Sequence, residues 1–111
     1  MKHLAALVLC GLLVPAVHAG GSLKEARKLW LEGNYAEAQD MYADLLNDGK
    51  DRVTAAIGLS KAYQSQGQYD KAQQAIEQAL KKEARPDLHA RLAELHYLRG
   101  RWSEEIGRAH V

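Results

Sequence analysis

The stretch Gly67-Gln68-Tyr69 recurs in this 111-residue chain in three related forms, and the predicted fold follows from their spacing. Each form is a glycine, a polar residue and a large aromatic residue, set between two stretches of helix-forming sequence. A motif that recurs every 33 or 34 residues is typical of a helical repeat array. Glycine ends a helix well because it adopts a positive φ without a Cβ clash, so we predict a turn at each copy. The copies, 34 and 33 residues apart, are Gly33-Asn34-Tyr35, Gly67-Gln68-Tyr69 and Gly100-Arg101-Trp102.

Apolar residues around these turns have the spacing of amphipathic helices. We predict first helices at residues 20–32, 53–66 and 87–99, each ended by its glycine, and second helices that begin at Tyr35 and Tyr69. The residues expected on the inner faces of the first helices are Leu23, Ala26, Trp30, Ala56, Leu59, Tyr63, Leu88, Leu92 and Leu95.

Local signals mark where the units begin and end. Ser22, with Glu25 three residues later, is the pattern of a helix N-cap. The polar run from Asn47 to Asp51 breaks the chain, and Pro86 can begin a helix because its missing N–H is not needed there. The predicted repeat units are residues 20–52, residues 53–85 and an incomplete third unit at residues 86–104.

The first two units also agree in side chains. The alanines shared by the two units are small enough for two helices to cross closely, and we expect Tyr35 and Tyr69 to be buried as apolar plugs with a polar tip. A single hairpin would leave one apolar face exposed, which stacking on a neighbour buries. The identical pairs are Gly33/Gly67, Tyr35/Tyr69, Ala38/Ala72, Gln39/Gln73 and Leu46/Leu80.

Residues 1–19 have the pattern of a secretory signal peptide, with Lys2, an apolar run from Leu4 to Val17, and cleavage expected after Ala19. The run is shorter than the ~20 residues of a membrane-spanning helix. An uncleaved membrane anchor and lipid attachment at Cys10 stay as alternatives. We therefore expect an exported protein in the periplasm or cell envelope of a bacterium.

The last residues depart from the repeat pattern. Glu105 stands where the first two units have Ala38 and Ala72, and the stretch Ile106–Val111 has no amphipathic spacing. We interpret residues 105–111 as a tail foreign to the natural protein, similar to a translated sequencing adapter, and expect the natural chain to continue differently. A natural frayed tail is the alternative.

Charge and composition argue against several classes of protein. The chain has 15 Lys and Arg against 14 Asp and Glu, without the basic excess of a nucleic-acid binder. Its one cysteine, Cys10, allows neither a disulfide framework nor a cysteine-based metal site. The chain has no phosphate-binding motif, and Ser60 is interpreted as a small packing residue. His89 and His96 lie seven residues apart, a spacing that favours a packing or surface role over metal binding. We predict no enzyme, metal or cofactor.

The middle unit carries the fullest pattern, in Leu59, Ser60, Tyr63, Gly67, Tyr69, Ala72, Ile76, Ala79 and Pro86. With these residues the chain resembles the tetratricopeptide repeat family from residue 22 to about residue 104. The resemblance implies an all-α fold of antiparallel helix hairpins, stacked as a short right-handed solenoid. It also implies that the first helices line a concave groove for a peptide or partner helix. Another helical-hairpin family of the same period stays an alternative.

The repeat register assigns the residues that would face this groove. Trp30 has a second interpretation, as a cover for the N-terminal end of the array. The chaperone-binding clamp of some relatives is not expected, because Lys61 and Asp87 stand where that clamp has Asn and Lys. The partner-binding residues that the resemblance implies are Arg27, Trp30, Lys61, Gln64, Glu94 and Tyr97.

The functional hypothesis is therefore an exported scaffold that binds a protein or peptide. We expect no nucleic acid and no small-molecule substrate, and membrane contact only through residues 1–19 if they stay uncleaved. One alternative is an N-terminal interaction arm of a larger enzyme, for example a peptidase. Another is a membrane-tethered assembly factor.

Overall fold

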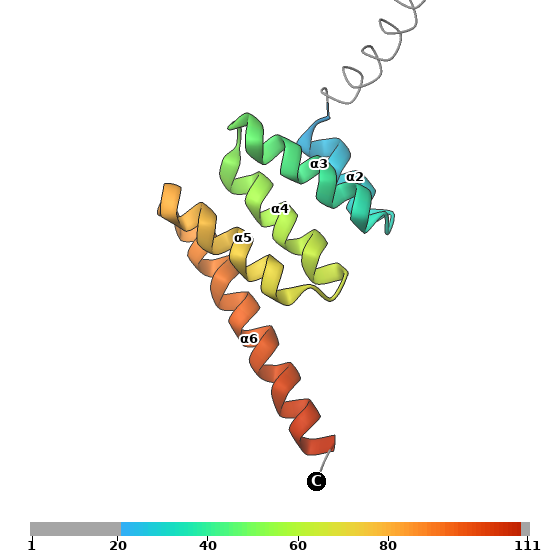
Figure 1. Ribbon diagram of the computed structural model, residues 1–111, viewed down its shortest axis with the longest axis vertical. Helices are drawn as coiled ribbons and strands as arrows, with labels where there is room; N and C mark the ends of the chain where they lie inside the picture. The colour runs from blue at the N-terminus through green and yellow to red at the C-terminus, as the bar shows by residue number, and fades with distance from the viewer. Residues whose placement is uncertain (1–20, 110–111) are drawn as a thin grey trace, which may run out of the picture.

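The computed structural model describes the backbone of residues 21–109 and the side chains of residues 21–101. In this part of the chain all regular structure is α-helical. Consecutive helices are joined by short turns and pack side by side as antiparallel hairpins (Figure 1). The all-α prediction is thereby confirmed. The helices are α2 (Leu23–Leu31), α3 (Tyr35–Asp48), α4 (Arg52–Ser65), α5 (Tyr69–Lys82) and α6 (Pro86–Ala109).

The first two predicted turns are present and have the same backbone geometry. Gly33 has φ +87°, and its amide donates to the Trp30 carbonyl at 3.1 Å, while the Asn34 amide donates to the Leu29 carbonyl at 2.8 Å. Gly67 has φ +76°, and the two corresponding hydrogen bonds are both 2.9 Å long. These paired bonds satisfy the last carbonyls of α2 and α4, which is the usual way in which a glycine ends a helix.

The third predicted turn is wrong. Gly100 lies inside α6, which continues without a break from Pro86 to Ala109 (Figure 1). After the first two turns the next helix folds back through Ala38 and Ala72, which are both fully buried. The third copy has Glu105 at this position, and burying a carboxylate at a helix crossing is unfavourable without a partner. Continuing the helix costs only about 1 kcal/mol for the glycine.

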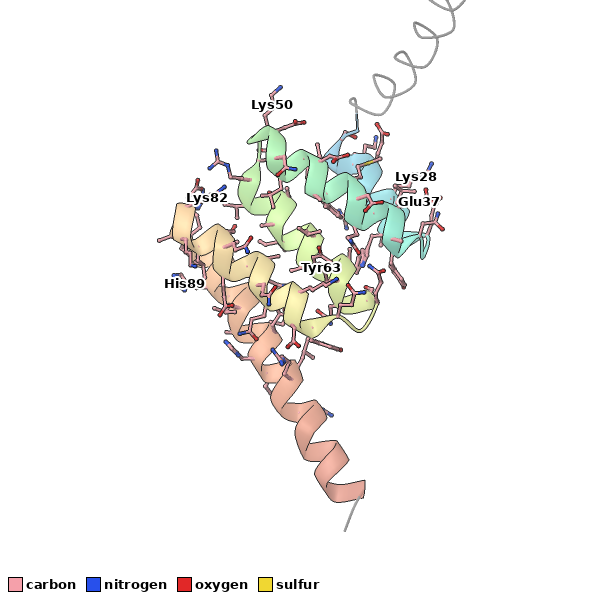
Figure 2. The ribbon with its side chains drawn as sticks, in the orientation of Figure 1. Lys28, Glu37, Lys50, Tyr63, Lys82 and His89 are labelled. Carbon is pink, nitrogen blue, oxygen red and sulfur yellow. The ribbon has the colours of Figure 1, made fainter. Side chains whose placement is uncertain are left out.

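The predicted helix ends are otherwise close to those observed. α2 begins at Leu23 rather than at residue 20, because Ser22 caps it and its Oγ accepts a hydrogen bond from the Glu25 amide at 3.1 Å. Pro86 is the first residue of α6, as predicted. The polar break after α3 is also present, and Figure 2 shows Lys50 at this turn.

Helix α4 lies at the centre of the array and contacts α2, α3, α5 and α6. Its buried residues face several neighbours, which is what a central helix requires. Two apolar clusters meet on it. The first consists of Ala26, Ala38, Tyr42 and Leu59, and the second of Ala56, Ala72, Ile76, Leu88 and Leu95.

The expectation that Tyr35 is buried is wrong. Tyr35 is 37% exposed, and Tyr69 is only partly buried against the second cluster. The large side chains in the interior are those seven residues later, Tyr42 at 6% and Ile76 at 0% exposed. The two tyrosines are the first residues of their helices, at the rim of the array, whereas positions two turns further along have helices on both sides.

The glutamine shared by the two units ties each unit to the next. Gln39 Oε1 accepts a hydrogen bond of 2.8 Å from Gln66 Nε2, just beyond the end of α4. Gln73 Oε1, 34 residues later, accepts one of 2.6 Å from Arg99 Nη1 of α6. The second helix of each unit is therefore bonded to the equivalent position of the following unit, which is the end of α4 in one case and the interior of α6 in the other.

Residues 1–19 and the side chains of residues 105–111 lie outside the described part of the chain. The signal peptide, the foreign tail and the exact repeat boundaries therefore stay predictions. None of the helices from α2 to α6 combines the length and apolar content that crossing a bilayer requires.

Candidate functional site

An open hollow lies between α2 and α4, and we call it the α2–α4 hollow. Its volume is about 350 Å³. Its walls come from the first helices of the first two units, with one residue from α3. The lining residues are Arg27, Trp30, Tyr42, Thr54, Ile57, Gly58 and Lys61.

Trp30 is held as a wall of the hollow. Its Nε1 donates a hydrogen bond of 2.9 Å to Ser65 Oγ, and that hydroxyl donates one of 2.9 Å to the Lys61 carbonyl. The indole is partly buried against the first apolar cluster. Trp30 therefore packs against α4 and lines the hollow.

Two cationic side chains border the hollow. Lys61 is exposed, and its Nζ lies 6.0 Å from the centre of the Trp30 ring, within the range of a cation–π interaction. Arg27 is also exposed and lies close enough to Tyr42 to act on its hydroxyl: burial raises the pKa of Tyr42, and the positive charge of Arg27 opposes that rise. Within residues 21–101, neither Arg27 nor Lys61 has an ion-pair partner.

The base of the hollow depends on a residue without a side chain. A Cβ added to Gly58 would lie 2.3 Å from Tyr42 Cε1, well inside the contact distance. The Tyr42 ring occupies the space that any other residue at position 58 would fill. Close approach of α3 and α4 at this point requires glycine.

The other end of the same face contains a buried arginine. Arg91 of α6 is 5% exposed, and its Nε donates to Ser60 Oγ at 2.8 Å while its Nη2 donates to Gln64 Oε1 at 2.6 Å. Its Nη1 donates to Glu94 Oε1. Ser60 in turn donates to the Ile57 carbonyl at 2.7 Å. We call Arg91, Ser60, Gln64 and Glu94 the Arg91 cluster.

The Arg91 cluster joins α4 to α6 through a charge that is almost removed from water. Burial lowers the pKa of Arg91, and the carboxylate of Glu94 raises it again by its charge and its hydrogen bond. An arginine stays protonated in proteins, so the cluster holds a permanent cation. Each of its three donor nitrogens has an acceptor, which is the condition for burying such a group.

The structure divides the six predicted site residues into three groups. Arg27, Trp30 and Lys61 line the α2–α4 hollow. Gln64 and Glu94 belong to the Arg91 cluster, where the Oε1 atom of each accepts a hydrogen bond from Arg91. Tyr97 is 65% exposed one turn further along α6, where its hydroxyl accepts a 3.5 Å hydrogen bond from Arg101. The described contacts do not connect Tyr97 to the hollow.

Several residues of this face were not predicted. Arg91 is the main one, although a signal was present: it lies between Leu88 and Leu95 on the buried face of α6, where a charge needs partners. The interpretation of Ser60 as a packing residue is incomplete, because its hydroxyl is also the acceptor for Arg91. The other unpredicted residues are Tyr42, Thr54 and Gly58 of the hollow.

The two histidines considered as ligands are both exposed on α6. Figure 2 shows His89 at the outer edge of the molecule, close to the start of that helix. Within the described residues there is no group of three or more His, Cys, Asp or Glu side chains that could hold a metal ion.

Comparison with protein families explains this arrangement of helices. A family model described as the tetratricopeptide repeat matches residues 29–95, more than half of the chain. The chain belongs to the tetratricopeptide repeat family. Repeats of this family generally mediate protein–protein interaction, usually without catalysis. No match was found among curated proteins or among solved structures.

Proposed function

We propose that this tetratricopeptide protein is an exported scaffold that binds a peptide or helix of a partner protein along α2, α4 and α6. The α2–α4 hollow is the observation that carries the proposal. It opens between two first helices, and it combines an aromatic wall with cationic side chains that have no ion-pair partner within residues 21–101. Partly apolar hollows with a few polar groups are the usual form of a binding site.

The face that contains the hollow continues from α2 to α6. Trp30 of α2 is bonded to Ser65 of α4, and Gln64, the residue before Ser65, is bonded to Arg91 of α6. The three first helices are thus held in fixed positions by side-chain bonds. A fixed surface of this kind loses little conformational entropy when it binds a partner, which favours affinity.

Site-specific photo-crosslinking tests the binding surface, in bacterial cells that express both this protein and its partner. A photoreactive amino acid replaces Thr54, which is exposed and lines the hollow, or Gln78, which is exposed on α5. We expect crosslinked partner protein from position 54 and little or none from position 78. Equal crosslinking at both positions, or crosslinking from α5 alone, would contradict the proposed surface.

The export half of the proposal rests on the signal-peptide pattern of residues 1–19. Cell fractionation with mass spectrometry of the purified protein tests it. We expect a periplasmic protein whose first residue is Gly20. A protein that retains Met1 in the membrane fraction would instead support the tethered alternative.

A further inference from the structure

We propose that the α2–α4 hollow recognises an internal acidic side chain of the partner, together with an apolar side chain beside it. This inference rests on the proposed function and adds the chemistry of the partner segment. It commits to one kind of occupant, a stretch of another protein chain that contains Asp or Glu next to a residue such as Leu, Ile or Phe.

Charge complementarity is the first argument. Of the seven residues that line the hollow two are basic, Arg27 and Lys61, and none is acidic. The ion pairs described within residues 21–101 lie elsewhere, at Arg85, Arg91 and Arg99. A carboxylate placed between Arg27 and Lys61 would accept charge-assisted hydrogen bonds, which are the stronger kind.

The remaining wall of the hollow is largely apolar. Trp30 and Tyr42 contribute rings, and Ile57 contributes an aliphatic side chain. The volume of about 350 Å³ is at the lower end of the roughly 300–1,000 Å³ of small-molecule pockets. It therefore suits one or two side chains of a peptide better than a cofactor.

The charges along the face also favour one direction for the bound segment. At the far end Glu94 exposes 58% of its side chain, while the guanidinium of Arg91 is buried. Because Arg91 and Glu94 form an ion pair, an acidic residue finds no uncompensated cation there, whereas Arg27 and Lys61 attract it at the hollow. A segment that extends from α2 to α6 is thus expected to place its acid at α2 and α4, and neutral or basic residues at α6.

A selection from random peptides tests the inference. Peptides of twelve residues, displayed with both ends joined to spacer sequence so that no terminal carboxylate is present, are selected on the whole protein. We expect enrichment of Asp or Glu beside an apolar residue. One enriched peptide is then synthesised with an amidated C-terminus and a fluorescent label, and its Kd is measured by anisotropy at low and high salt.

Two charge reversals of matched chemistry give the decisive comparison. Lys61 stacks on Trp30 at 6.0 Å inside the hollow, and Lys71 stacks on Tyr63 at 5.9 Å outside it. Lys61→Glu should raise the Kd by at least about tenfold, since it replaces a charge-assisted bond by repulsion. Lys71→Glu should change the Kd by less than about twofold, because exposed charges away from the interface contribute little.

Each other outcome has a defined meaning. Enriched peptides without an acid, or equal effects of Lys61→Glu and Lys71→Glu, overturn the inference but leave peptide binding intact. An enriched peptide that binds with a free C-terminal carboxylate but not as the amide also overturns it. If no peptide is enriched and Thr54 gives no crosslink, the proposed function fails together with the inference.

Discussion

The face that runs from α2 across α4 to α6 has an arginine at each end, and the two arginines lie in opposite environments. At the α2–α4 end Arg27 is exposed beside an open hollow, whereas at the α4–α6 end Arg91 is buried among three acceptors. Gly58 and Arg91 occupy equivalent positions, 33 residues apart in successive units. Helix α3, which precedes α4, supplies the large Tyr42 next to Gly58. Helix α5, which precedes α6, has the smaller Ile76 at the position equivalent to Tyr42.

The comparison shows how one repeat position serves either binding or packing. At Gly58 no side chain extends from α4 onto the face, and the Tyr42 ring of α3 packs directly against the helix. The hollow opens at this point. At the equivalent position of α6, the long side chain of Arg91 is buried and bonds α6 to α4. The difference depends on the joint volume of two positions and on the presence of acceptors, and not on the charge of either residue alone.

The largest expected effect is a loss of stability at the α4–α6 end that leaves the α2–α4 end better protected. Leu95 is fully buried in the second apolar cluster, so Leu95→Ala should lower the free energy of unfolding by about 2–5 kcal/mol. Hydrogen exchange should show that α6 loses protection before α2 does, since repeats depend mainly on their neighbours. Leu31→Ala is the control: Leu31 is 65% exposed and the change should stay within about 0.5 kcal/mol.

The next test compares two glycines. Gly58→Ala should destabilise by about 1–3 kcal/mol through overpacking against Tyr42. Gly100→Ala should stabilise by about 0.4–1 kcal/mol, because Gly100 is inside a helix with no atom within 4 Å of the added Cβ. Urea unfolding measures both. Destabilisation by Gly100→Ala would indicate that a turn exists there after all.

Two serines of α4 give a smaller but closely matched comparison. Each hydroxyl donates to a carbonyl of its own helix and accepts one N–H, from Arg91 for the buried Ser60 and from Trp30 for the exposed Ser65. Ser60→Ala should cost about 1.5–3 kcal/mol, since a buried cation loses its acceptor. Ser65→Ala should cost about 0.5–1.5 kcal/mol. Equal losses would show that the burial of Arg91 is unimportant.

The smallest effect concerns the ion pair between Arg99 and Asp70, whose side chains are 41% and 78% exposed. Asp70→Asn should cost less than about 1 kcal/mol, because water weakens such pairs. The loss should shrink further at high salt. Glu94→Gln, at a pair whose arginine side chain is only 4% exposed, should cost more and depend less on salt. Thermal unfolding at two salt concentrations distinguishes the two variants.

The features that were predictable from the sequence are those fixed by neighbouring residues. The turns at Gly33 and Gly67 need only a glycine at positive φ and the carbonyls of the preceding helix. The start of α6 needs only Pro86. Such signals repeat at a constant interval, and the helix order and the family followed from them.

The features that escaped prediction depend on residues distant in the sequence. Gly100 has the local signature of a turn, but a turn is stable only when the following helix finds a surface to pack on. Arg91 acquires its partners from α4, 27 and 31 residues earlier. The repeat register put Arg27, Trp30 and Lys61 on one face, and all three line the α2–α4 hollow. The bonds of Gln64 and Glu94 to Arg91 could not be predicted, because they depend on which side chain of α6 reaches α4.

The position of Trp30 gives the proposed binding site an optical signal of its own. The indole forms a wall of the hollow, its N–H is bonded to Ser65, and the ammonium of Lys61 lies over its ring. Tryptophan emission responds to nearby charge and to water. The chain has one other tryptophan, Trp102, so a Trp102→Phe variant would have Trp30 as its single tryptophan, which can be excited selectively over the tyrosines. Its emission wavelength would report directly whether the hollow is empty or filled.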